Sequence, residues 1–168
     1  MASATTRRIG EVIGLAGVIG SLLFVGLEVR QSSVATQAAT DAAVADGFRE
    51  LNLVIAESPE LARVLAADPE SASEADQIQV LGLWRALFHI WSNGHRQYLN
   101  GTLDPAIHEA VAQEISTYAG EPSGGGSINQ LDRRSRVMQW AWESERFIFN
   151  PDFQMFVDSI LAATHQTR

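Results

Sequence analysis

A run of sixteen consecutive uncharged residues near the N-terminus, residues 12–27, is the strongest hydrophobic signal in the chain. Extended to residues 9–29, with Glu11 and Glu28 near its two ends, the run reaches the roughly 20 mostly apolar residues that a helix needs to cross about 30 Å of hydrocarbon. We therefore expect a transmembrane helix at residues 9–29, a short tail at residues 1–8 and a soluble domain at residues 30–168.

Two other interpretations of this run stay open. It could be a cleaved signal peptide, with Arg7 and Arg8 as the basic region and a cut after Ala35, or it could be a buried core helix. The run is longer than the roughly 7–15 apolar residues of most signal peptides, and the charged Glu28 and Arg30 lie between it and the cut. These two features favour a permanent anchor.

The charges beside the run indicate its orientation. Arg7 and Arg8 precede it and Arg30 alone follows closely. Because positive charge is retained on the cytoplasmic side, the tail at residues 1–8 is expected in the cytoplasm and the soluble domain on the extracytoplasmic side.

Start and stop signals divide the rest of the chain into helices. Ser58-Pro59 and Asn150-Pro151 are typical helix starts, Ser71 with Glu74 fits a capping box, and Asn100-Gly101 is a typical stop. We expect helices at residues 31–57, 59–67, 74–100, 105–118, 129–149 and 151–164, with a flexible loop at residues 120–127. No long segment alternates with period two, so the predicted fold is all-α: an N-terminal transmembrane helix continuing into a five- or six-helix soluble bundle.

Small residues form one stripe along the apolar run. The stripe consists of Gly10, Gly14, Gly17 and Ser21, which follow helical spacing. Such a stripe lets two helices approach closely in lipid, which predicts a homo-oligomer or a subunit of a membrane complex. The alternative is that glycine is simply common in membrane helices.

Composition excludes several functions. Residues 31–168 contain nine Arg and eighteen Asp or Glu, and this acidic balance argues against nucleic acid and against docking on anionic lipid. The chain has no cysteine, which excludes disulfides and thiolate chemistry. It also has no lysine, which excludes a Schiff base and a phosphate-loop lysine.

Aromatic side chains recur at helical spacing within residues 74–100, where Trp84, Trp91 and His95 share one face. A stripe of this kind usually belongs to a core, and a histidine within it is usually neutral and hydrogen-bonded. On the opposite face, Arg85 and Arg96 could hold an anion or pair with acids of a neighbouring helix.

Residues 129–149 contribute two further candidate features. Trp142 and Glu145 share an apolar stripe, so Glu145 is expected to be a buried acid with Arg85, Arg96 or His95 as partner. A basic patch lies at the start of the same segment, where positive charge is unfavourable beside the helix dipole. The patch consists of Arg133, Arg134 and Arg136, and a lipid headgroup or a carboxylate would explain it.

Searches for catalytic signatures find none. The chain contains no His-Glu-x-x-His, no Glu-x-x-His and no Gly-x-Ser-x-Gly, and its four histidines are not spaced as a metal set. We therefore expect no catalytic residues, no metal and no cofactor. If the chain were an enzyme, His95 with Glu145 would be the first acid–base pair to test.

Two segments resemble a large group of uncharacterised bacterial proteins that have one N-terminal span and a compact helical domain. They are Phe24-Val25-Gly26-Leu27-Glu28-Val29-Arg30-Gln31 and Trp142-x-x-x-Arg146-x-x-Phe149-x-Pro151-x-Phe153-x-x-Phe156-Val157-Asp158. The resemblance implies a location in a bacterial cell membrane and implies no activity.

Two hypotheses for function follow. The leading hypothesis is a membrane-anchored helical interaction or scaffold module without catalysis, whose partners are the lipid bilayer and a second protein chain. The alternative is a sensor or binding domain for a small ligand, with an aromatic-lined pocket. The candidate ligand-binding residues are Trp84, Trp91, His95, Trp142 and Glu145.

Overall fold

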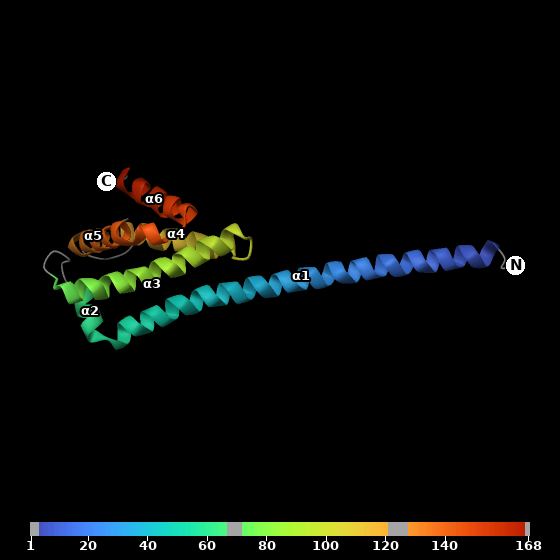
Figure 1. Ribbon diagram of the computed structural model, residues 1–168, viewed down its shortest axis with the longest axis horizontal. Helices are drawn as coiled ribbons and strands as arrows, with labels where there is room; N and C mark the ends of the chain where they lie inside the picture. Colours follow the sequence, from blue (N-terminus) through green and yellow to red (C-terminus); the bar gives the residue numbers. More distant parts are fainter. Residues whose placement is uncertain (1–3, 67–71, 121–127, 167–168) are drawn as a thin grey trace. The chain divides into compact units, whose positions relative to one another are not determined.

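The computed structural model describes residues 4–66, 72–120 and 128–166, and every regular element in these ranges is helical. The elements are α1 (Ala4–Glu57), α2 (Pro59–Ala66), α3 (Glu74–Leu99), α4 (Pro105–Ala119), α5 (Ile128–Glu145), the short 3-10 helix η1 (Arg146–Ile148) and α6 (Pro151–Gln166) (Figure 1). The chain divides into two units, residues 1–39 and residues 40–168. The predicted all-α class is confirmed.

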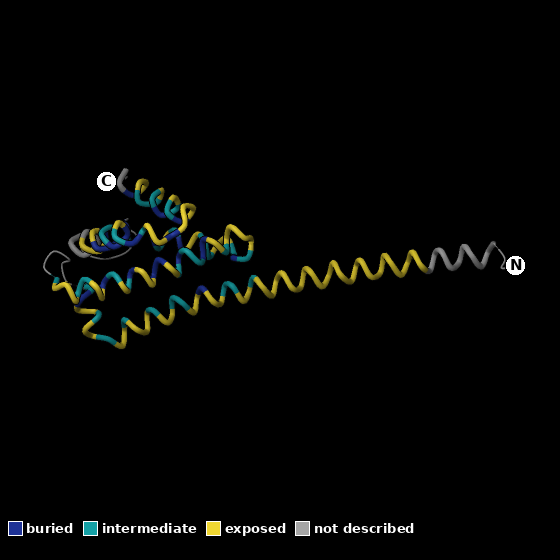
Figure 2. The backbone as a smooth tube through the Cα atoms, viewed as in Figure 1, coloured by how far each residue is buried: buried dark blue, intermediate teal, exposed yellow. Residues whose placement is uncertain are grey.

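The first unit consists of the N-terminal part of α1. Within its described side chains the surface is apolar and exposed, with Leu22, Leu23 and Phe24 each about two-thirds exposed. Figure 2 shows this exposure as a continuous yellow stretch. Among the described residues, α1 is the helix whose length and composition would suffice to cross a membrane.

The second unit has an aromatic centre contributed by α3, α5 and α6. Phe88 packs edge-on against Trp142 with ring centroids 5.2 Å apart, and Trp142 packs edge-on against Phe153 at 5.7 Å. All three side chains are fully buried. Apolar residues of α4, including Val111 and Ile115, complete this core. The aromatic stripe of residues 74–100 is therefore a core stripe, as helical spacing predicts.

Local side-chain hydrogen bonds fix most helix starts where the sequence predicts them. Ser58 Oγ accepts from the Leu61 amide, and Asp104 Oδ1 accepts from the Ala106 amide directly before α4. Asn150 Oδ1 accepts from the Phe153 amide at the start of α6. Each contact satisfies an amide that would otherwise lack a partner in the first helical turn.

The predicted capping box before α3 is wrong by two residues, although α3 begins at Glu74 as expected. The box is formed by Ser73 and Asp76, where the sequence suggested Ser71 and Glu74. Ser73 Oγ accepts from the Asp76 amide, and the Asp76 carboxylate accepts from the Ser73 amide. Ser71 itself lies outside the described residues.

Two helix ends also refine the sequence prediction. Gly101, two residues after α3, and Gly120, directly after α4, adopt φ of 71° and 108°, values that favour glycine. The predicted helix at 129–149 ends instead at Glu145, and η1 follows it. Pro151 drives Asn150, the residue before it, away from helical backbone, so helical backbone cannot continue through that position. Of the predicted loop at 120–127, residues 121–127 lie outside the described residues.

Candidate functional site

A cavity of about 370 Å³ lies among α1, α2, α3, α4 and α5 in the unit of residues 40–168. Its lining consists of Phe48, Leu51, Asn52, Ile55, Ala62, Leu65, Leu83, Trp84, Leu87, Glu114, Tyr118, Arg133, Arg134 and Val137. An apolar cavity of about 150 Å³ can hold a benzene molecule, so this one has room for a larger ligand. It is also at the lower end of the usual range for small-molecule sites, roughly 300–1,000 Å³.

Trp84 is the feature that separates this cavity from an ordinary packing gap. The residue is 6% exposed, and its indole Nε1 is the buried side-chain polar atom that lacks a hydrogen-bond partner among the described residues. Its two buried counterparts are paired: Trp91 Nε1 donates to Glu114 and Trp142 Nε1 donates to Asp158, each at 2.9 Å. Leaving a buried donor unmatched costs about 1–3 kcal/mol, so the indole of Trp84 requires an explanation.

The charged groups of the lining come from α4 and α5. Burial raises the pKa of the Glu114 carboxyl, and the hydrogen bond from Trp91 partly opposes that rise. Burial also raises the pKa of the Tyr118 hydroxyl. The Glu114 carboxylate adds to this rise, and the Arg134 guanidinium opposes it. Glu114 and Arg134 therefore both act electrostatically on Tyr118.

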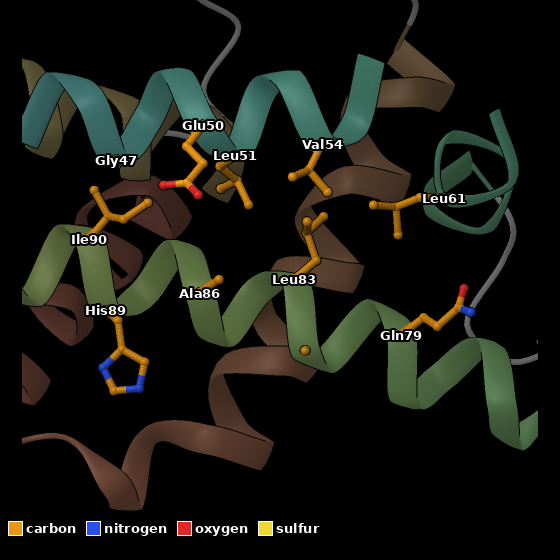
Figure 3. Close-up of a pocket in the computed structure, with 11 residues that line it drawn as sticks. Gly47, Glu50, Leu51, Val54, Leu61, Gln79, Leu83, Ala86, His89 and Ile90 are labelled. Atoms are coloured by element: carbon orange, nitrogen blue, oxygen red, sulfur yellow. The ribbon is translucent and has the colours of Figure 1, made fainter. Parts of the chain in front are cut away.

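A second hollow is an open groove between α1 and α3 (Figure 3). Its volume is about 640 Å³, and Leu51 and Leu83 line both the groove and the cavity. At one end a Cβ added to Gly47 would lie 3.3 Å from Ile90 Cγ1, so the two helices approach closely there. The groove has no buried unpartnered polar atom among the described residues, which makes the cavity the stronger candidate site.

The structure separates the predicted ligand-binding residues. Trp84 lines the cavity, whereas Trp91 and Trp142 are fully buried in the core beside it. Glu145 is also buried and forms two hydrogen bonds with Arg85, from Nε at 2.8 Å and from Nη2 at 2.7 Å. Arg85 is one of the three partners that the sequence offers for this acid.

His95 lies apart from the cavity in a histidine pair. Its Nδ1 is 2.9 Å from His108 Nε2, so one ring donates and the other accepts. Tyr98 stacks on His108 and Phe156 stacks on His95, with centroids 3.9 and 4.3 Å apart. Burial, helped by the proximity of His108, lowers the pKa of His95, and burial lowers the pKa of His108 as well.

All three arginines of the basic patch are exposed. Arg133 and Arg134 also line the cavity, whereas Arg136, on the same helix, does not. Along α1, Gly14 and Gly17 have open space where a Cβ would lie, and Ser21 is exposed. The surroundings of Gly10 lie outside the described side chains.

The sequence prediction missed the residues that α1, α2 and α4 contribute to the lining. Phe48, Leu51 and Ile55 recur at helical spacing, which indicates a buried face but not what it covers. Glu114 and Tyr118 are one helical turn apart, and this spacing was the available signal that they share a face.

Neither a metal centre nor a known relative defines the site. Within residues 4–66, 72–120 and 128–166, no three His, Asp or Glu side chains come together as a group that could hold a metal ion. Comparison of the chain with protein-family models, with curated proteins and with solved structures found no match. The resemblance to bacterial single-span proteins therefore stays a prediction, and the function has to be argued from the cavity.

Proposed function

We propose that the chain is a membrane-anchored helical accessory protein that acts by binding and not by catalysis. In this proposal the N-terminal part of α1 anchors the chain in a bacterial cell membrane, with residues 40–168 on the extracytoplasmic side. That second unit takes up a small, largely apolar ligand in the cavity among α1–α5. The anchor and the ligand site are separate claims and are tested separately.

The ligand-binding part of the proposal rests on one observation. A cavity larger than a benzene site is lined by Trp84, whose buried indole N–H has no hydrogen-bond partner among the described residues. Apolar enclosure with a few polar groups is the usual composition of a small-molecule site. This observation favours the ligand-binding hypothesis over a scaffold whose domain has only a packed core.

The exposed apolar surface of α1 supports the anchor. Exposing apolar side chains such as Leu15, Leu22 and Phe24 to water is unfavourable, whereas exposing them to the hydrocarbon of a bilayer is not. Two arginines at Ile19 and Leu22 would each oppose insertion by roughly 2.5–3.5 kcal/mol at the centre of a span.

Alkaline carbonate extraction of membranes tests the anchor. We expect the wild type to stay with the membrane and the Ile19→Arg/Leu22→Arg variant to be released, while Val34→Arg, outside the proposed span, behaves as the wild type. Mass spectrometry of the membrane-bound protein should give an intact chain near 18.3 kDa. Release of the wild type, or a mature chain that begins at Thr36, would overturn the anchor.

Titration of the full chain in nanodiscs of zwitterionic lipid tests the ligand site. The probe is octanol, followed by intrinsic tryptophan fluorescence with empty nanodiscs as blank. Ala62→Phe places a ring in the cavity and should weaken binding at least tenfold, whereas Ala86→Phe, which lines only the open groove, should leave it unchanged. Equal octanol affinity in wild type and Ala62→Phe would contradict the site.

A second candidate function is assembly through the small-residue stripe of α1. It is supported by the open space that faces Gly14 and Gly17, which would let another helix approach closely. We expect Gly14→Leu and Gly17→Leu to abolish chemical crosslinking to a partner in mild detergent. Gly26→Leu, which also faces open space but lies off the stripe, is the control. Identical crosslinking in all four proteins would exclude this assembly.

A further inference from the structure

We infer that the ligand of the cavity is a single-chain anionic amphiphile, a medium-chain carboxylate, whose head lies at Arg134 and whose chain lies among α1, α2 and α3. This inference rests on the proposed function, because it assumes that the cavity takes a small ligand. It adds the chemical class and the orientation of that ligand.

Polarity is segregated across the lining of the cavity. The lining residues of α1, α2 and α3 carry no charge, and Asn52 and Trp84 are the polar ones among them. The charged lining residues all belong to α4 and α5: Glu114, Arg133 and Arg134. A ligand that matches this division has one apolar end and one charged end, as an amphiphile has.

The unpartnered charged group at the cavity is a hydrogen-bond donor. Arg134 lines the cavity and has no hydrogen bond or ion pair within the part of the chain that the structure describes. A guanidinium can donate but cannot accept. Glu114, the acidic group of the lining, already accepts from Trp91 Nε1. The complementary head is therefore an acceptor with negative charge.

Arg134 places that head on the side of the cavity that α4 and α5 line. Glu114 and Tyr118 line the same side, and both Arg134 and Glu114 act electrostatically on the Tyr118 hydroxyl. A carboxylate there would gain the attraction of Arg134 and experience repulsion from an ionised Glu114. The two residues should consequently affect the affinity in opposite directions.

Cavity size favours one short chain. A volume of about 370 Å³ is close to the lower limit of roughly 300 Å³ for small-molecule sites, and a lipid with two long chains would exceed it.

Residues 31–168 are acidic, with nine Arg against eighteen Asp or Glu. The two arginines that line the cavity therefore differ in charge from most of this domain.

The test compares octanoate with octanol, which share the chain and differ in the head. Both are titrated at pH 7.5 into the full chain in zwitterionic nanodiscs. We expect octanoate to bind more tightly than octanol to the wild type. Arg134→Gln should weaken the binding of octanoate about fivefold, which corresponds to the loss of one partly exposed charge pair. The same variant should change the affinity for octanol by no more than about twofold.

Two further variants keep the result interpretable. Glu114→Gln retains an acceptor for Trp91 and should strengthen octanoate binding about twofold to threefold by removing the repulsion. Arg136→Gln removes the same charge from the same helix at an exposed position outside the lining, and it should change neither affinity.

The outcomes separate the inference from the proposed function. If octanol and octanoate bind equally well and Arg134→Gln changes neither, the anionic head is wrong while the cavity remains a ligand site. If Arg136→Gln weakens octanoate as much as Arg134→Gln does, the effect is long-range attraction and the inference is again overturned. If neither compound binds and Ala62→Phe matches the wild type, the proposed function fails as well.

Discussion

The ion pair of Glu145 shows how a single buried acid is accommodated at the residue scale. Glu145 is about 95% buried, whereas the side chain of Arg85 is 53% exposed. The guanidinium contacts both carboxylate oxygens and connects the end of α5 to α3. Removing one partner of such a pair leaves a buried carboxylate without its compensating charge, which is unfavourable.

We expect Arg85→Gln to lower the urea midpoint of the full chain in mild detergent, because Glu145 then stays buried without a cation. Arg96→Gln is the matched control, since Arg96 lies on the same face of α3 and its guanidinium donates to the neutral side chain of Asn93. Arg85→Gln should lower the urea midpoint more than Arg96→Gln does. Equal midpoints for the two variants would show that the pair contributes nothing.

The pair of His95 and His108 predicts a pH dependence at the same scale. Burial lowers the pKa of both rings, the proximity of His108 adds to the effect on His95, and the Asp152 carboxylate opposes it. The folded state therefore binds fewer protons than the unfolded state, in which histidine titrates near about 6.5. The contribution of the pair to stability is complete above that pH and decreases as the pH falls below it.

We expect the urea midpoint to fall between pH 7.5 and pH 5.5, and the fall to be smaller in the variant His95→Gln/His108→Gln. His89→Gln, an exposed histidine of α3, should show the wild-type fall. The raised pKa of Glu114 acts with the opposite sign, so the difference between wild type and double variant isolates the histidine pair. If the difference in urea midpoint between the wild type and the double variant were the same at both pH values, this assignment would be contradicted.

At the scale of elements, local signals identified the helices well and tertiary packing decided the rest. Proline starts and glycine stops are short-range features, so the predicted ends near residues 59, 100 and 105 agree with the structure. Two overlapping patterns at the start of α3, Ser71-x-x-Glu74 and Ser73-x-x-Asp76, both have the residue types of a capping box. The local sequence alone does not distinguish between them.

Ser73→Ala should destabilise the protein by about 1 kcal/mol, the usual cost of losing an N-cap side chain. Ser71→Ala removes the serine of the competing pattern and should cost less than about 0.5 kcal/mol, because Ser73 is the N-cap of α3. Urea titration of both variants at neutral pH measures the difference. A larger cost for Ser71→Ala would restore the capping box that the sequence first suggested.

The candidate site was less predictable than the helices because it is assembled from five of them. The sequence distinguishes Trp84, Arg133 and Arg134 for separate reasons, but only the packing shows that they share a cavity. Spacing along one helix identifies a buried face, whereas the partners of that face depend on the tertiary structure. Trp91 and Trp142 have the same sequence signal as Trp84 and are core residues with paired indoles.

At the scale of the whole molecule, the absence of cysteine allows the orientation to be measured directly. We expect the exposed Ser159→Cys, in α6, to react with a membrane-impermeant maleimide in intact cells, because the charge distribution favours an extracytoplasmic domain. A cysteine at Thr5, before the proposed span, should react only after lysis. The reverse labelling pattern would place the domain in the cytoplasm.

The central claim is that the cavity beside Trp84 holds a ligand. Fluorine NMR of the full chain in nanodiscs, with 6-fluorotryptophan at its four tryptophans, tests it most directly. Trp84→Phe assigns the Trp84 signal, and octanoate is then added to the wild type. We expect the Trp84 signal to shift with saturation while the signals of the core residues Trp91 and Trp142 stay within their line widths. Saturable shifts at Trp91 or Trp142 without one at Trp84, or no shift at all, would contradict the account.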